Sequence, residues 1–78
     1  MNSTTITAII NLVTALLPTL EAGAVTLYAD VKQLLADANA SGAATPDQVS
    51  QVQALDAASD AALEKAHAAY AALSASSA

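Results

Sequence analysis

The chain of 78 residues is acidic and strongly apolar: it carries two basic and seven acidic residues, a net charge of -5, and 55% hydrophobic residues. An apolar fraction this high excludes intrinsic disorder, and the length allows one short domain, which we take as residues 1–78. The lack of cysteine excludes disulfides, thiolate catalysis and cysteine-based zinc sites. The two basic residues are too few for a nucleic-acid or anionic-membrane surface.

A heptad pattern of apolar residues runs through the first half of the chain and predicts one long helix over residues 4–40. Its apolar residues alternate in steps of three and four, the spacing that brings side chains to one face of a helix. The larger members of this apolar seam are Ile6, Ile10, Val13, Leu17, Leu20, Leu27, Val31 and Leu34. Because the seam keeps its phase through Pro18, we expect a kinked continuous helix, with a break between residues 17 and 24 as the alternative.

A loop over residues 41–45 and a second helix over residues 46–74 follow. Thr45, a proline after it and Gln48 three residues on form the pattern of a capping box, in which two side chains satisfy the first amides of a helix. Three alanines of the inner face would let another helix approach closely: Ala62, Ala66 and Ala69. Residues 75–78, without charge or large apolar side chains, are expected to fray.

The predicted fold is therefore an all-α two-helix hairpin that assembles into a helical-bundle oligomer. Thirteen of the 18 Ile, Leu and Val residues precede the loop, and a hairpin has a single internal seam that cannot cover them all. A single core is already marginal in so short a chain. We expect the first helices to associate between chains through the apolar seam, or to meet a larger partner or a membrane. The sequence leaves the number and orientation of the chains open.

The side chains that could carry chemistry are few, and we predict no enzyme, no cofactor and no metal site. One histidine, no cysteine and scattered serines offer no Ser–His–acid arrangement. Asp60, Glu64 and His67 share one helix face, a spacing that can bring two ligands to one ion, but such sites need further carboxylates. The interpretation we favour is a solvated acidic face that keeps an alanine-rich helix soluble.

An apolar first segment (ITAIINLVTALLPTL), a small-residue loop, a TPDQ helix start and an Ala/Asp-rich helix containing LDAASDAAL follow one another along the chain. This order resembles small Ala-rich helical proteins of tailed phages and prophages, over most of the chain. The resemblance implies a non-enzymatic virion component that self-associates or packs against larger phage structural proteins. It implies location in the virion.

A membrane-inserted helix is the alternative interpretation. Residues 6–28 are long enough to span a bilayer, and Glu21 is their single charge. Burying that carboxylate costs about 2–3 kcal/mol on insertion scales, and no basic residue flanks the stretch before Lys32. In this reading the chain is a small phage membrane protein, holin-like or envelope-interacting, of the bacterial inner membrane.

Overall fold

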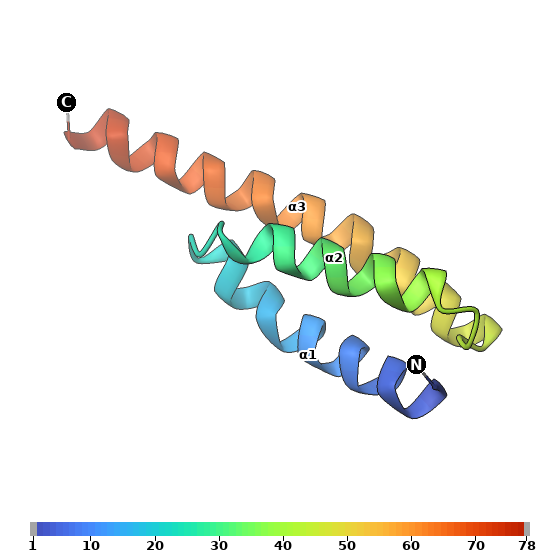
Figure 1. Ribbon diagram of the computed structural model, residues 1–78. Coiled ribbons are helices and arrows are strands. Elements are labelled where there is room, and N and C mark those ends of the chain that lie inside the picture. The colour runs from blue at the N-terminus through green and yellow to red at the C-terminus, as the bar shows by residue number, and fades with distance from the viewer. Residues whose placement is uncertain (1, 78) are drawn as a thin grey trace.

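The computed structural model describes residues 2–77, with the side chains of residues 2–73. Over this range the chain forms three helices and no strand: α1 (Ser3–Glu21), α2 (Leu27–Ala40) and α3 (Pro46–Ser77). The all-α class is thus confirmed, and the two-helix hairpin is wrong. Helix α2 runs antiparallel to both neighbours, and the three helices form a rod of 50 × 16 × 16 Å (Figure 1). The last turns of α3 project past the turn that joins α1 to α2 (Figure 1).

The predicted continuous helix over residues 4–40 is interrupted by a turn over residues 22–26. Gly23 causes the interruption, because its φ of +120° is accessible to glycine and strained for other residues. The amide of Gly23 donates to the Leu20 carbonyl at 3.1 Å and that of Ala24 to the Thr19 carbonyl at 3.2 Å, the bonds of a Schellman helix end. Pro18 lies inside α1 without ending it.

The predicted loop and helix start agree with the structure. Helix α2 ends at Ala40 and α3 begins at Pro46. The backbone N–H of Gln48 donates to Thr45 Oγ1 at 3.2 Å, and the backbone N–H of Thr45 donates to Gln48 Oε1 at 3.0 Å. These two bonds confirm the capping box.

The second helix extends past its predicted end at residue 74, and fraying of residues 75–78 stays a prediction. Helix α3 continues to Ser77, because adding one residue to a long helix adds one backbone hydrogen bond at little nucleation cost. Residue 78 lies outside the described residues.

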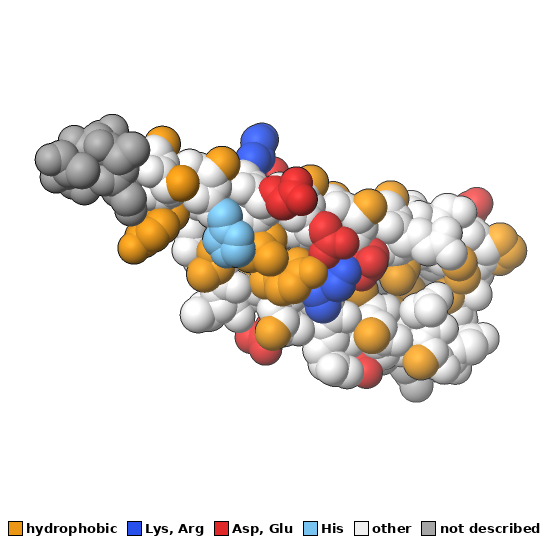
Figure 2. All heavy atoms as spheres, turned by 90° about the horizontal axis from the view of Figure 1, so that it is seen from above, with side chains coloured by type: hydrophobic (Ala, Val, Ile, Leu, Met, Phe, Trp, Pro, Cys, Tyr) orange, Lys and Arg blue, Asp and Glu red, His pale blue; other side chains and the backbone are white. Residues whose placement is uncertain are grey.

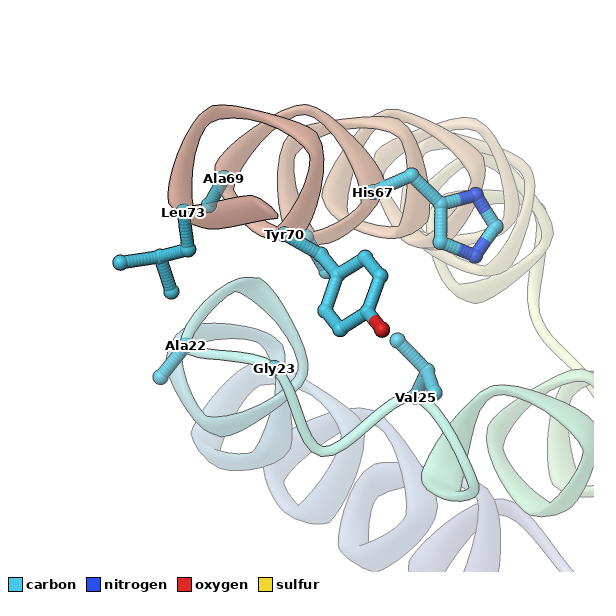
Figure 3. Close-up of a pocket in the computed structure, with 8 residues that line it drawn as sticks. Ala22, Gly23, Val25, His67, Ala69, Tyr70 and Leu73 are labelled. Atoms are coloured by element: carbon cyan, nitrogen blue, oxygen red, sulfur yellow. The ribbon is translucent and has the colours of Figure 1, made fainter. Parts of the chain in front are cut away.

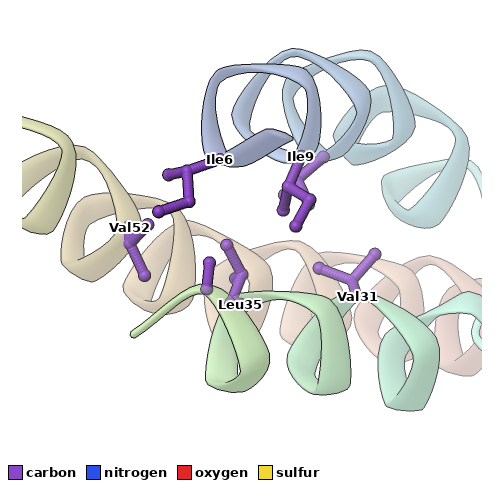
Figure 4. Packing of buried hydrophobic residues seen from close by; sticks show 7 residues of the cluster. Ile6, Ile9, Val31, Leu35 and Val52 are labelled. Atoms are coloured by element: carbon purple, nitrogen blue, oxygen red, sulfur yellow. The ribbon is translucent and has the colours of Figure 1, made fainter. Parts of the chain in front are cut away.

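The core fills the space between the three helices near the amino-terminal half of α1. Ile6 and Ile9 of α1, Val31 and Leu35 of α2, and Val52 of α3 point toward one another (Figure 4). Ile9 and Leu35 lie outside the predicted seam, yet they are buried. The reason is that α1 and α2 each contact two other helices, which requires an apolar stripe wider than the seam of a two-helix hairpin.

The apolar seam lies largely inside this single chain. Its fully buried members are Ile6, Val13, Leu20 and Val31, and its half-buried members are Ile10, Leu17, Leu27 and Leu34. A third helix therefore covers within one chain much of the apolar surface that a hairpin would leave open. Contacts of the seam between chains stay a prediction.

Helix α3 contributes small side chains to the bundle. Ser59, Ala62 and Ala66 are buried, and the Ser59 hydroxyl donates to the Leu55 carbonyl at 2.7 Å, which satisfies its polar atom inside the helix pair. Ala69, one turn further on, is exposed and lies beside Ala22 and Gly23, just past the end of α1. Of the three predicted close-approach alanines, two therefore belong to the interior of the bundle and the third to its open end.

Candidate functional site

A hollow of about 440 Å³ opens between the turn at residues 22–26 and the projecting part of α3. Its lining comes from the turn (Ala22, Gly23, Val25) and from α3 (Ala66, His67, Ala69, Tyr70, Leu73). The Tyr70 ring extends from α3 toward Val25, whereas His67 and Leu73 point to opposite sides of it (Figure 3). We call this hollow the end groove.

The end groove exposes large apolar side chains. Tyr70 is 72% exposed, Leu73 69% and Val25 38%. The exposure follows from helix length, because α3 has 32 residues against 19 in α1 and 14 in α2. At 1.5 Å per residue, the segment of α3 that follows the buried Ala66, from His67 to Ser77, extends about 17 Å with only the turn beside it. Exposed apolar side chains gathered in this way mark an interaction surface.

The end groove is also free of formal charge. No acidic or basic residue lies between Lys65 and the end of the chain, or between Glu21 and Asp30, apart from His67. The net charge of -5 is therefore carried by other parts of the molecule. Two copies of so acidic a chain repel each other least where they meet at this end.

A polar cluster joins α2 to α3 beside the end groove. Lys32 Nζ lies 2.6 Å from Asp56 Oδ1 and 3.1 Å from Asp60 Oδ1, and the Tyr28 hydroxyl donates to Asp60 Oδ1. Figure 2 shows these acidic and basic side chains gathered over the middle of one face. Asp60 of the predicted solvated acidic face is exposed and, like Asp56, also pairs with a cation across the helix interface. Glu64 and His67 are exposed.

The contacts within this cluster shift the pKa values of three groups. The hydrogen bond from Tyr28, followed by that from Lys32, lowers the pKa of Asp60. The same bond raises the pKa of Tyr28, and the hydrogen bond to Asp56 raises that of Lys32. All three shifts favour the protonation states present at neutral pH, so the cluster supports the fold rather than activating a group for catalysis.

We predict an acid-dependent effect of Asp60→Asn on stability. A lowered folded-state pKa means that the contribution of Asp60 is present above the ordinary aspartate pKa and is lost as pH falls through the lowered value. The variant should therefore melt a few degrees below wild type near pH 7, since exposed ion pairs contribute little, and this difference should shrink at an acidic pH below the lowered pKa of Asp60. Asp37→Asn is the matched control, because the Asp37 carboxylate accepts from Gln33 on its own helix. An equal difference between Asp60→Asn and wild type at both pH values would contradict the pairing.

The Gln48 side chain fastens α1 to the start of α3. Besides completing the capping box, its side-chain nitrogen Nε2 donates to the Ser3 carbonyl and to Thr7 Oγ1, each at 2.9 Å. Gln48 is buried, and all of these bonds lie at the end of the rod opposite the end groove. At the groove end, Lys65 Nζ lies 3.7 Å from Glu21 Oε2. The parallel pair α1 and α3 is thus fastened by polar contacts at both ends.

Two other candidates are a metal site and a membrane-spanning helix, and they have less support than the end groove. Among the described residues, no group of three His, Cys, Asp or Glu is placed to hold a metal ion. Within the same range, α1 is the one helix long and apolar enough to cross a membrane, a property that core helices of soluble proteins and signal sequences share. In this fold, the buried side chains of α1 face α2 and α3.

The end groove was not predicted from the sequence, because a two-helix hairpin leaves no projecting end of the second helix. The signal that could have found the groove is the glycine at position 23. A helix end there leaves α1 and α2 too short to cover the whole of α3. Comparison with known protein families, with characterised proteins and with solved structures finds no match to this chain.

Proposed function

We propose that this chain is a non-enzymatic structural protein that acts by self-association through the end groove. The observation that carries the proposal is the exposure of Tyr70 and Leu73 on the uncharged, projecting end of α3. Burial of such a side chain gives about 1.5–3 kcal/mol, so a pair of them on each copy provides a substantial driving force for association. A second acidic copy approaches this end with the least repulsion.

The biological setting we propose is a phage particle. The support is the resemblance of the segment order to small Ala-rich proteins of tailed phages, together with the rod shape and the polar cluster that supports the fold. In that setting the chain is a small virion component that self-associates or packs against larger virion proteins.

A membrane role is the second candidate, supported by the length and apolar composition of α1. It requires α1 to leave the bundle and expose its buried face to lipid. Sedimentation with phosphatidylcholine vesicles separates the two proposals: a virion component stays in the supernatant, and a membrane protein sediments with the vesicles.

We predict that Tyr70→Asp weakens self-association and Ala71→Asp does not. Both variants add one negative charge to the same turn of α3, but Ala71 does not line the end groove. Mass in detergent-free buffer, measured by size exclusion with light scattering over a range of concentrations, gives the result. Wild type should form a defined oligomer and Tyr70→Asp a single chain. A wild-type mass of one chain at every concentration, or an equal loss in both variants, would contradict the proposal.

A further inference from the structure

We infer that the turn over residues 22–26 is a hinge, and that two copies of the chain exchange α1 through it to form a domain-swapped dimer. The inference rests on the proposed self-association and specifies its form. The partner is a second copy of this chain, and the surface that receives its α1 is the α2–α3 face of the bundle.

The backbone of the turn is close to a helix on both sides. Ala22 has φ -73° and ψ -7°, and Thr26 has φ -64° and ψ -22°, so both lie in the right-handed helical region. The Leu27 and Tyr28 amides already donate to carbonyls three residues back, at 3.0 and 3.1 Å. The reversal of direction is therefore confined to the residues from Gly23 to Val25. A change in the backbone dihedral angles of these few residues would join α1 and α2 into one helix.

The apolar seam keeps its heptad phase across this turn. From Leu17 through Leu20, Ala24 and Leu27 to Val31, the steps are three, four, three and four residues. In the three-helix bundle of a single chain, which we call the closed chain, the turn separates these residues onto two helices. The heptad phase of one helix then does not have to match that of the other. In a straightened helix they form one continuous apolar face, which is what a helix passing between two bundles requires.

The exchange costs few contacts. Each α1 in the dimer would pack on the α2 and α3 of the other copy as it packs on its own in the closed chain, including the bonds of Gln48 to Ser3 and Thr7. The two forms differ at the hinge and at the end groove, so the balance between them depends on these two places and on protein concentration.

The projecting end of α3 fits the straightened form. Helix α2 runs antiparallel to α3, so a helix that continues backward from Leu27 follows α3 toward its carboxyl end (Figure 1). The straightened α1 would then lie beside Tyr70 and Leu73, which in the closed chain have only the turn beside them. The end groove is therefore the surface that opening of the hinge covers.

The decisive variant is Gly23→Ala. A side chain at a φ of +120° strains the closed turn, and a Cβ there meets no atom within 4 Å, so the effect is one of backbone conformation. A helical alanine is unstrained. Because each dimer relieves the strain at two hinges, the association constant should rise about a hundredfold over wild type, as read from mass against concentration.

Gly42→Ala is the matched control. Gly42 also has a positive φ, +72°, and a Cβ there also meets no atom within 4 Å. This second turn cannot straighten into one helix, because Pro46 keeps Thr45 out of the helical region. Gly42→Ala should lower the melting temperature and leave the association constant unchanged.

A cross-link distinguishes exchange from docking of closed chains. Ser3 and Thr45 both lie beside the Gln48 side chain, far from the hinge, and the chain has no natural cysteine. The double substitution Ser3→Cys and Thr45→Cys is treated with a short bismaleimide, in the wild-type and the Gly23→Ala backgrounds. A swapped dimer gives a covalent dimer on a denaturing gel, and a docked dimer gives cross-linked single chains.

The outcomes separate the two proposals. Covalent dimers whose share rises with protein concentration and with Gly23→Ala support the exchange. A dimer by mass that cross-links only within chains overturns the exchange and leaves self-association standing. Single chains by mass in both backgrounds overturn both. If Gly23→Ala fails to fold by circular dichroism, the wild-type background refolded at high concentration decides, and purely intrachain products there overturn the exchange.

Discussion

Replacing Gln48 by alanine should lower the free energy of unfolding by about 2–4 kcal/mol. The estimate combines loss of the bond that Gln48 Oε1 accepts from the Thr45 backbone amide with loss of two part-buried hydrogen bonds to α1, three bonds at about 0.5–1.5 kcal/mol each. The side-chain nitrogen Nε2 of Gln48 donates to the Ser3 carbonyl and to Thr7 Oγ1, and both acceptors lose this donor in the variant. For a chain of this length, the melting temperature should fall by about 10–20 °C in a thermal scan followed by circular dichroism.

Two further variants test where this effect comes from. Gln51→Ala removes the same side chain from an exposed position on the same helix and should melt within about 2 °C of wild type. Gln48→Glu retains the acceptor for the Thr45 amide and loses the donor to Ser3, so it should keep the cap and lose the fastening to α1. Equal melting temperatures for Gln48→Ala and Gln51→Ala would show that Gln48 does not fasten the helices.

Leu20→Asp should abolish the folded state at 25 °C. Leu20 is fully buried at the groove end of α1. Its replacement removes about 2–5 kcal/mol of apolar packing and adds the cost of burying a carboxylate. A chain of 78 residues has a total stability of only about 4–12 kcal/mol. The expected result is loss of cooperative melting and of most of the helical circular dichroism signal.

Leu12→Asp is the control for this prediction. Leu12 lies on the same helix and is 48% exposed, so the same chemical change should cost less than about 1 kcal/mol. If Leu20→Asp melted like Leu12→Asp, the result would contradict the burial of Leu20 in the bundle. The burial of Leu20 also means that lost assembly in Leu20→Asp reports lost folding, so contacts between chains are better probed at Tyr70.

The helical class, the second loop and the start of α3 could be predicted from the sequence because local signals specify them. Thr45, Pro46 and Gln48 act over three residues, and the structure shows the hydrogen bonds that this pattern predicts. The buried members of the apolar seam could also be found, since heptad spacing reports directly which side chains share a face of a helix.

The break in the first helix was predicted only as the alternative to a continuous helix, because two signals competed. The heptad phase continues through residues 17–24 and favours one helix, whereas Gly23 permits a helix end. Glycine costs about 1 kcal/mol inside a helix, which local sequence alone cannot weigh against packing of a third helix. The burial of Ile9 and Leu35, outside the predicted seam, was missed for the same reason, because a hairpin has no second partner to bury them.

By itself, the sequence determined where helices can begin and which faces of them are apolar. Only the tertiary structure decided that the chain reverses direction at Gly23 and that Gln48 binds Ser3 across 45 positions of the chain. It also decided that α3 extends past α1 and α2. The reason is the range of the forces involved. Helix caps and apolar periodicity act between neighbours in sequence, whereas the choice between a straight and a folded first helix depends on apolar area buried against distant residues.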